Sequence, residues 1–106
     1  MLNEKIVNEV YDNLSSAKEA YTVASEKSIN LNFTLDVLVA DATQNGDIVG
    51  KNADARSACA KSLFGENYNS LEEAKNAERK ARHILDLANL EVERVRALLR
   101  LQEVLK

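Results

Sequence analysis

The stretch that decides the fold is residues 71–99, LEEAKNAERKARHILDLANLEVERVRALL. Apolar residues recur along it in alternating steps of three and four, interrupted by one Glu: Leu71, Ala74, Glu78, Ala81, Leu85, Ala88, Val92, Val95 and Leu99. An earlier stretch has the same spacing: Val7, Val10, Leu14, Ala17, Tyr21, Ala24, Ser28, Leu31, Leu35, Leu38 and Ala42. A sustained repeat of about 3.5 residues keeps one face of a helix against a partner helix. The two seams therefore predict two long helices paired as in a coiled coil.

Turn residues set the expected end of the first helix. The chain contains no proline, and this helix is expected to begin at Leu2 or Asn3 and to run over about residues 3–43. At ~1.5 Å per residue it would be about 60 Å long, which predicts an elongated molecule. The dipeptide Asn45-Gly46 is typical of a turn, because these residues tolerate positive φ. Residues 44–52 are therefore predicted to be a loop.

Capping residues divide the second half of the chain. Asn52 is a suitable N-cap for a short helix over about residues 53–64, and Gly65 is suited to a left-handed stop. The apolar side of this short helix is expected to carry Ala55, Cys59, Ala60, Leu63 and Phe64. Ser70 and Glu73 form a capping box, which predicts that the last helix covers about residues 71–105.

Residues 29–37, INLNFTLDV, favour a different structure, because apolar and polar residues alternate strictly as in a strand. No second run in the chain could pair with such a strand, and the heptad seam continues through it. We therefore predict a helix here, apolar on nearly all sides and so buried on more than one side. A kink between Ser28 and Asn32 is compatible with this reading.

The last helix has a second apolar stripe, which calls for a second neighbour: Ala77, Ile84, Leu87, Leu90, Leu98 and Leu105. A two-helix hairpin whose seam is rich in Ala buries little area. The alternative is that the short helix covers the second stripe, but about twelve residues cannot cover a helix of about thirty-five. The sequence thus predicts an all-α protein with one domain, residues 1–106. In it a long antiparallel hairpin of coiled-coil type, with a short connecting helix, assembles into a helical-bundle oligomer, a dimer or higher.

Net charge and hydropathy argue against several classes of protein. The chain has 106 residues and a net charge of −3, which argues against a generally basic nucleic-acid binder. The charge is −4 over residues 1–44, 0 over 45–70 and +1 over 71–106. Neither a signal peptide nor an apolar run long enough for a membrane span is evident. We expect a cytoplasmic protein with no membrane association.

The loop GDIVGKN, residues 46–52, invites comparison with a phosphate-binding P-loop but lacks its spacing. Only three residues separate the glycines, and Asn52 follows Lys51 where Ser or Thr is required. A weaker possibility remains, in which Lys51, Asn52 and Arg56 hold an anion at a helix N-terminus. The alternative is an ordinary turn and N-cap with solvated charges.

No set of residues in the sequence suits catalysis. His83 is the single histidine, and Lys80 stands where a di-iron bundle needs Glu. Cys59 is the single cysteine, so it cannot form an internal disulfide, and it is expected to pack as a small apolar residue. We predict a protein that is not an enzyme, with no cofactor and no metal.

Basic residues on the last helix give a weak nucleic-acid candidate: Arg79, Lys80, Arg82, Arg94, Arg96 and Arg100. Carboxylates interleave with them, and no aromatic residue after position 70 could stack on bases. A solvated face with salt bridges is the competing interpretation.

Two segments carry a family resemblance: Gly46-x-Ile48-x-Gly50-Lys51-Asn52 with Arg56, and the Glu/Arg/Leu-rich residues 90–101. Over about residues 35–106 the chain resembles small, largely uncharacterised helical-hairpin proteins of bacteriophages and prophages. The resemblance implies a phage setting and a long hairpin with a short connecting helix.

The leading functional hypothesis is a non-catalytic phage or prophage protein that binds a host protein, such as a defence component, or a phage protein. A second hypothesis is an oligomer that binds a small anionic ligand, such as a nucleotide signal. A third is an accessory protein of replication or recombination that associates with nucleic acid.

Overall fold

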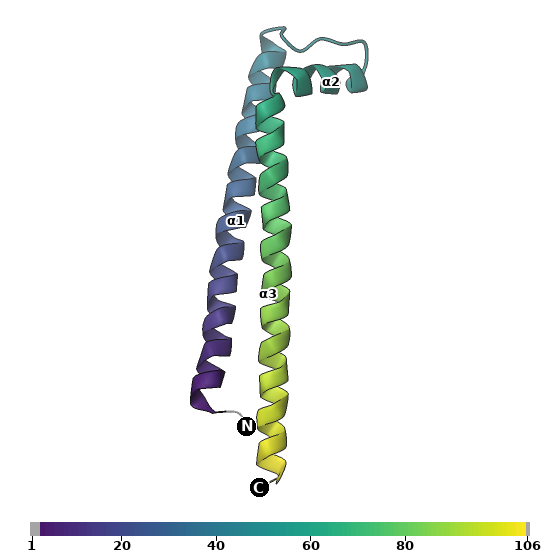
Figure 1. The fold of residues 1–106 in the computed structure, drawn as a ribbon. Coiled ribbons are helices and arrows are strands. Elements are labelled where there is room, and N and C mark those ends of the chain that lie inside the picture. The colour runs from purple at the N-terminus through teal and green to yellow at the C-terminus, as the bar shows by residue number, and fades with distance from the viewer. Residues whose placement is uncertain (1–2, 106) are drawn as a thin grey trace. The chain divides into compact units, whose positions relative to one another are not determined.

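The structure, a computed structural model, describes residues 3–105. These residues form three α-helices and no strand: α1 (Glu4–Gln44), α2 (Ala53–Leu63) and α3 (Gly65–Leu105) (Figure 1). The all-α prediction is therefore confirmed. Residues 29–37 lie inside α1, so their alternating pattern does not mark a strand. Leu2, one of the two expected starts of the first helix, lies outside the described residues.

Asn3 begins α1 as its N-cap. The Asn3 Oδ1 atom accepts a hydrogen bond of 2.9 Å from the backbone N–H of Ile6, and its carbonyl accepts one of 3.1 Å from Val7. These bonds satisfy two of the amides that a helix start leaves without a partner.

The Asn45-Gly46 turn ends α1 as predicted. Gly46 has a φ of 79°, a conformation that favours glycine. Its N–H donates to the carbonyl of Thr43 at 3.2 Å, and the N–H of Asp47 donates to the carbonyl of Ala42 at 2.9 Å. This pair of bonds is the Schellman motif, which closes a helix C-terminus.

The boundary between α2 and α3 differs from the prediction. Gly65 has no positive φ and opens α3, so Ser70 and Glu73 lie within this helix instead of capping its start. Only Phe64 separates the end of α2 from the start of α3. The Phe64 carbonyl accepts the N–H of Tyr68 at 2.9 Å, the i to i+4 bond of a helix. Phe64 and Tyr68 both pack on a buried cluster. Burial of these two aromatic residues accounts for a helix that begins before the local capping signal.

Inter-residue contacts divide the chain into two compact units. The terminal unit comprises the chain up to Ala24 and from Glu78 onward, and the loop unit is Ser25–Ala77. Each unit therefore contains part of α1 and part of α3, and the loop unit also contains α2.

The terminal unit is built around Val10, Val92 and Val95, with Val7 and Leu14 packed against them. Val95 is the most deeply buried of the large side chains, with 1% of its surface exposed. Tyr11 on α1 contacts Arg96 on α3, and Tyr21 contacts Arg82. Because the contact positions rise along α1 as they fall along α3, the two helices run antiparallel in this unit.

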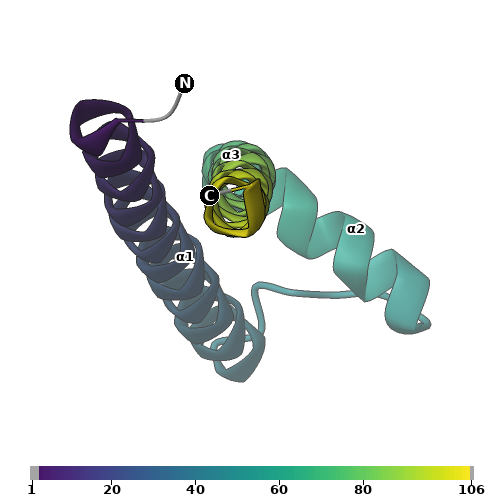
Figure 2. The ribbon, with the colours of Figure 1, turned by 90° about the horizontal axis from the view of Figure 1, so that it is seen from below.

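The loop unit has its own core of Ala42, Ile48 and Ala60. Partly buried side chains complete it: Val39, Cys59, Phe64 and Tyr68. The loop after α1 runs back beside α2 to the far end of that helix (Figure 2). On α2, Ala60 is buried, whereas Ala55 and Leu63, both expected on its apolar side, are exposed.

The seams predicted from the heptad repeat are the buried sides of α1 and α3. Every seam residue of α1 is buried or half-buried, and so is every seam residue of α3 except Leu99, which is 37% exposed. At this end of α3 the covered side has moved to Leu98 and Gln102, which are half-buried. An α-helix has about 3.6 residues per turn, so a strict 3.5-residue seam drifts around it over several turns.

Gly50 is required by close packing between the loop and α2. A Cβ atom at this position would lie 2.7 Å from the backbone nitrogen of Arg56 and 2.8 Å from two atoms of Ala55. We expect Gly50→Ala to lower the free energy of unfolding by about 1–3 kcal/mol, because the backbone must shift to admit the methyl group. Urea denaturation followed by circular dichroism measures this change.

Gly65→Ala is the matched control. A Cβ at Gly65 would have no heavy atom within 4 Å, and its φ is not positive. This substitution is expected to leave the stability unchanged or slightly increased, since Ala favours a helix over Gly. A Gly50→Ala protein as stable as Gly65→Ala would show that the loop does not pack on α2 as described.

Candidate functional site

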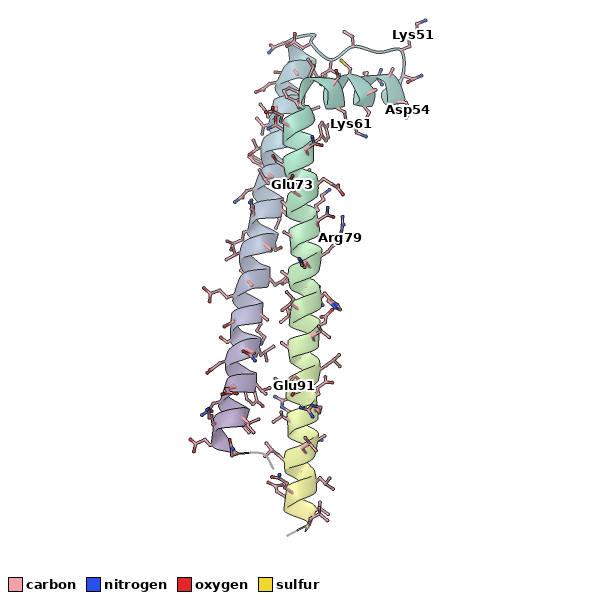
Figure 3. All side chains as sticks on the ribbon, viewed as in Figure 1. Lys51, Asp54, Lys61, Glu73, Arg79 and Glu91 are labelled. Carbon is pink, nitrogen blue, oxygen red and sulfur yellow. The ribbon has the colours of Figure 1, made fainter. Side chains whose placement is uncertain are left out.

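The predicted anion site lies where the loop enters α2, and two of its three residues make local hydrogen bonds there. The Asn52 Oδ1 atom accepts the backbone N–H of Ala55 at 2.8 Å and so acts as the predicted N-cap. A guanidinium nitrogen of Arg56 donates to the carbonyl of Gly50 at 3.4 Å. Lys51 is exposed and points away from the loop (Figure 3). The contacts at Asn52 and Arg56 thus serve the local fold.

Arg82 and Arg94, which belong to the basic candidates on α3, are paired with carboxylates of the same helix. Arg82 meets Asp86 at 3.2 Å, and Arg94 meets Glu91 at 2.6 Å. The hydrogen bonds between Glu91 and Arg94 lower the pKa of Glu91 and raise the pKa of Arg94. Such pairs on an exposed helix surface neutralise charge locally, as the salt-bridged interpretation predicts.

Contacts to tyrosines of α1 link two exposed arginines of α3, Arg82 and Arg96, to the other helix of the terminal unit. The Arg82 guanidinium lies 5.5 Å from the centre of the Tyr21 ring, and Arg96 Nε donates to the Tyr11 hydroxyl at 3.3 Å. Hydrogen bonding to Tyr21, with the charge of Asp86, raises the pKa of Arg82. Both arginines thus help to pair α1 with α3.

The remaining basic residues do not complete a continuous track. Arg79, Lys80 and Arg100 are exposed on α3. Arg79 and Arg82 are three apart, and Arg96 and Arg100 are four apart, so these arginines share a side of the helix. Asp86 and Glu93 lie between the two pairs on that side and interrupt the row of positive charge that phosphate binding along one face needs.

His83 and Cys59 are not part of a metal site in the described residues. No group of three or more His, Cys, Asp or Glu residues in the range 3–105 could hold a metal ion. Cys59 is half-buried, and its thiol lies 3.6 Å from the carbonyl oxygen of Asp47, which it can meet as a weak donor. The thiol therefore packs between α2 and the loop, as expected for a small apolar residue.

Large apolar side chains remain exposed in both units and form the most prominent surface feature. On α3 of the terminal unit Ile84, Leu87 and Leu90 are each more than half exposed. They belong to the second apolar stripe that the sequence indicated. On α1 of the loop unit Ile29 and Phe33 are 63% and 68% exposed. The prediction that residues 29–37 are buried on more than one side is therefore wrong for the described chain, in which only the seam side, with Leu31 and Leu35, is covered.

A groove of about 480 Å³ adjoins the α3 stripe in the terminal unit. It is lined by Val10, Asn13, Ser16, Ala17, Ala20, Ile84, Leu87, Ala88 and Glu91. Sequence analysis did not single out this groove, because Ser16 and Ala20 lie outside the heptad seam. A second hollow in the loop unit is smaller, about 320 Å³, and polar side chains such as Asp36, Glu72 and Lys75 contribute to its lining.

Comparison of the chain with protein-family models, curated proteins and solved structures gives no match. Within residues 3–105, none of the helices combines the length and the apolar character needed to cross a membrane.

Proposed function

We propose that this protein is a non-catalytic, oligomeric helical protein of phage or prophage origin that acts by binding. Its partner is a host protein, such as a defence component, or a phage protein, met in the cytoplasm of the bacterial host. The proposal rests chiefly on a stripe along α1 of the loop unit: Ile29, Phe33 and Val37, which are 63%, 68% and 42% exposed.

The spacing of these three residues fits recognition of a protein. Residues four apart lie one above the other on a helix, so Ile29, Phe33 and Val37 share one side of α1. Large apolar side chains gathered on one helix face are the usual anchors of helix-in-groove recognition. Their exposure to water is unfavourable, and a partner that covers them gains apolar burial.

The proposed architecture is based on the pairing of α1 with α3 that is seen within each unit. In the terminal unit α1 and α3 are antiparallel, and in the loop unit Leu35 of α1 and Leu71 of α3 line the same hollow. We take α1 and α3 to form one long, coiled-coil-like antiparallel hairpin in a single domain. Copies of this hairpin would assemble into a helical bundle.

The phage setting rests on the resemblance of residues 46–52 and 90–101 to phage hairpin proteins. The two other hypotheses, a small anionic ligand and nucleic acid, stay predictions. The contacts of Asn52, which caps a helix, and of Arg82 and Arg94, which are paired with carboxylates, favour neither of them.

Affinity purification from phage-infected bacteria tests the proposed partner binding. Tagged wild-type protein is expected to recover one host or phage protein at a fixed ratio. Phe33→Glu is expected to reduce that recovery at least tenfold, because it places a charge in the centre of the stripe.

Thr34→Glu is the matched control, since Thr34 is exposed, adjacent in sequence and turned by about 100° from Phe33, the centre of the stripe. It should recover the partner as the wild type does. Equal recovery by Phe33→Glu, or no specific protein recovered by the wild type, would contradict the proposal.

A further inference from the structure

The groove of the terminal unit combines two complementary surfaces. Its small-residue floor is Ser16, Ala17 and Ala20 on α1, and its aliphatic ridge is Ile84 and Leu87 on α3. Ile84 and Leu87 are both 52% exposed. A ridge beside a hollow is what two-fold packing requires, because each copy then offers a knob and receives one.

We infer that this groove is a contact between two copies of the chain, related by a twofold axis, in which the ridge of each copy fills the floor of the other. This inference rests on the oligomer of the proposed function and identifies the surface through which two copies meet. The groove volume of about 480 Å³ gives room for large aliphatic side chains.

Charge also favours this pairing. The α1 part of the terminal unit has an excess of carboxylates: Glu4, Glu9, Asp12 and Glu19 against Lys5 and Lys18, net −2. From residue 78 to 105, α3 has six Lys and Arg side chains against five Asp and Glu, net +1. Ridge-to-floor packing brings α3 of one copy beside α1 of the other, so segments of opposite net charge become neighbours.

Sedimentation velocity on the full chain measures dimerisation and tests the proposed contact when a charged residue is placed in the ridge. Leu87→Glu is expected to raise the dimer dissociation constant at least about 30-fold, as loss of a central interface anchor does. Asn89→Glu adds the same charge two residues later on another side of α3, where Asn89 is exposed. It should dimerise as the wild type does, and circular dichroism checks that both variants keep their helix content.

A disulfide between copies gives a second readout that does not depend on Leu87→Glu folding. In a Cys59→Ser background, one tagged chain carries Ser16→Cys and a differently tagged chain carries Leu87→Cys. Mixing and mild oxidation are expected to link the two tags through a disulfide between these positions.

The outcomes separate this inference from the proposed function. If the wild type self-associates but Leu87→Glu does so equally and the two tags do not link, the surface is wrong while the oligomer stands. A wild type that stays monomeric overturns both the surface and the oligomer.

Discussion

Replacing Val95 with Asp is expected to remove much of the folding free energy of the terminal unit. Val95 is 1% exposed and packs with Val10 and Val92. A carboxylate there would be buried without a partner, which costs about 3–5 kcal/mol. Whole proteins are stable by only ~5–15 kcal/mol, so the urea midpoint followed by circular dichroism should fall sharply.

Val104→Asp is the control with the same chemical change. Val104 lies on the same helix and is 81% exposed, so the new carboxylate stays in water and the midpoint should hardly move. If the two variants unfolded at the same urea concentration, the valine cluster between α1 and α3 would not be the core of this unit.

Replacing Ala60 with Asp is expected to release α2 from the loop unit. Ala60 is 3% exposed and contributes to the cluster with Ala42 and Ile48. The helix has only 11 residues, and helices shorter than ~12–15 residues are marginal without tertiary packing. Amide hydrogen exchange in α2 should therefore accelerate by roughly 100-fold, the signature of a low-energy local opening.

Ala58→Asp places the same charge on the same helix at an exposed position. Exchange in α2 should stay close to that of the wild type in this variant. Slow exchange in Ala60→Asp would mean that α2 does not depend on its contact with Ala42 and Ile48.

The regular parts of the fold could be predicted because their signals are local and repeated. The heptad spacing identified the buried side of α1 from Val7 to Ala42, and Asn45-Gly46 and Asn52 marked a helix end and a helix start. The start of α3 could not be predicted, because burial of Tyr68 outweighs the capping box at Ser70. That burial involves Ile48 and Ala42, which lie far from Tyr68 in the sequence.

The candidate site was less predictable than the fold. The second apolar stripe on α3 was visible in the sequence, since Ile84 and Leu87 repeat at helical spacing. The groove beside it was not visible, because it depends on which turn of α1 faces that stripe. Pairs such as Arg94–Glu91 follow from helical spacing, whereas the contact between Arg96 and Tyr11 joins residues 85 positions apart.

We propose that the exposed apolar faces of this helical protein are covered by further copies of the chain and by a partner protein. The molar mass of the purified chain in solution, measured by light scattering across a range of concentrations, tests the self-association. We predict a defined multiple of 11.8 kDa that persists on dilution. A mass of one chain at every concentration would rule out the oligomer, since the stripe of Ile84, Leu87 and Leu90 would then remain in water.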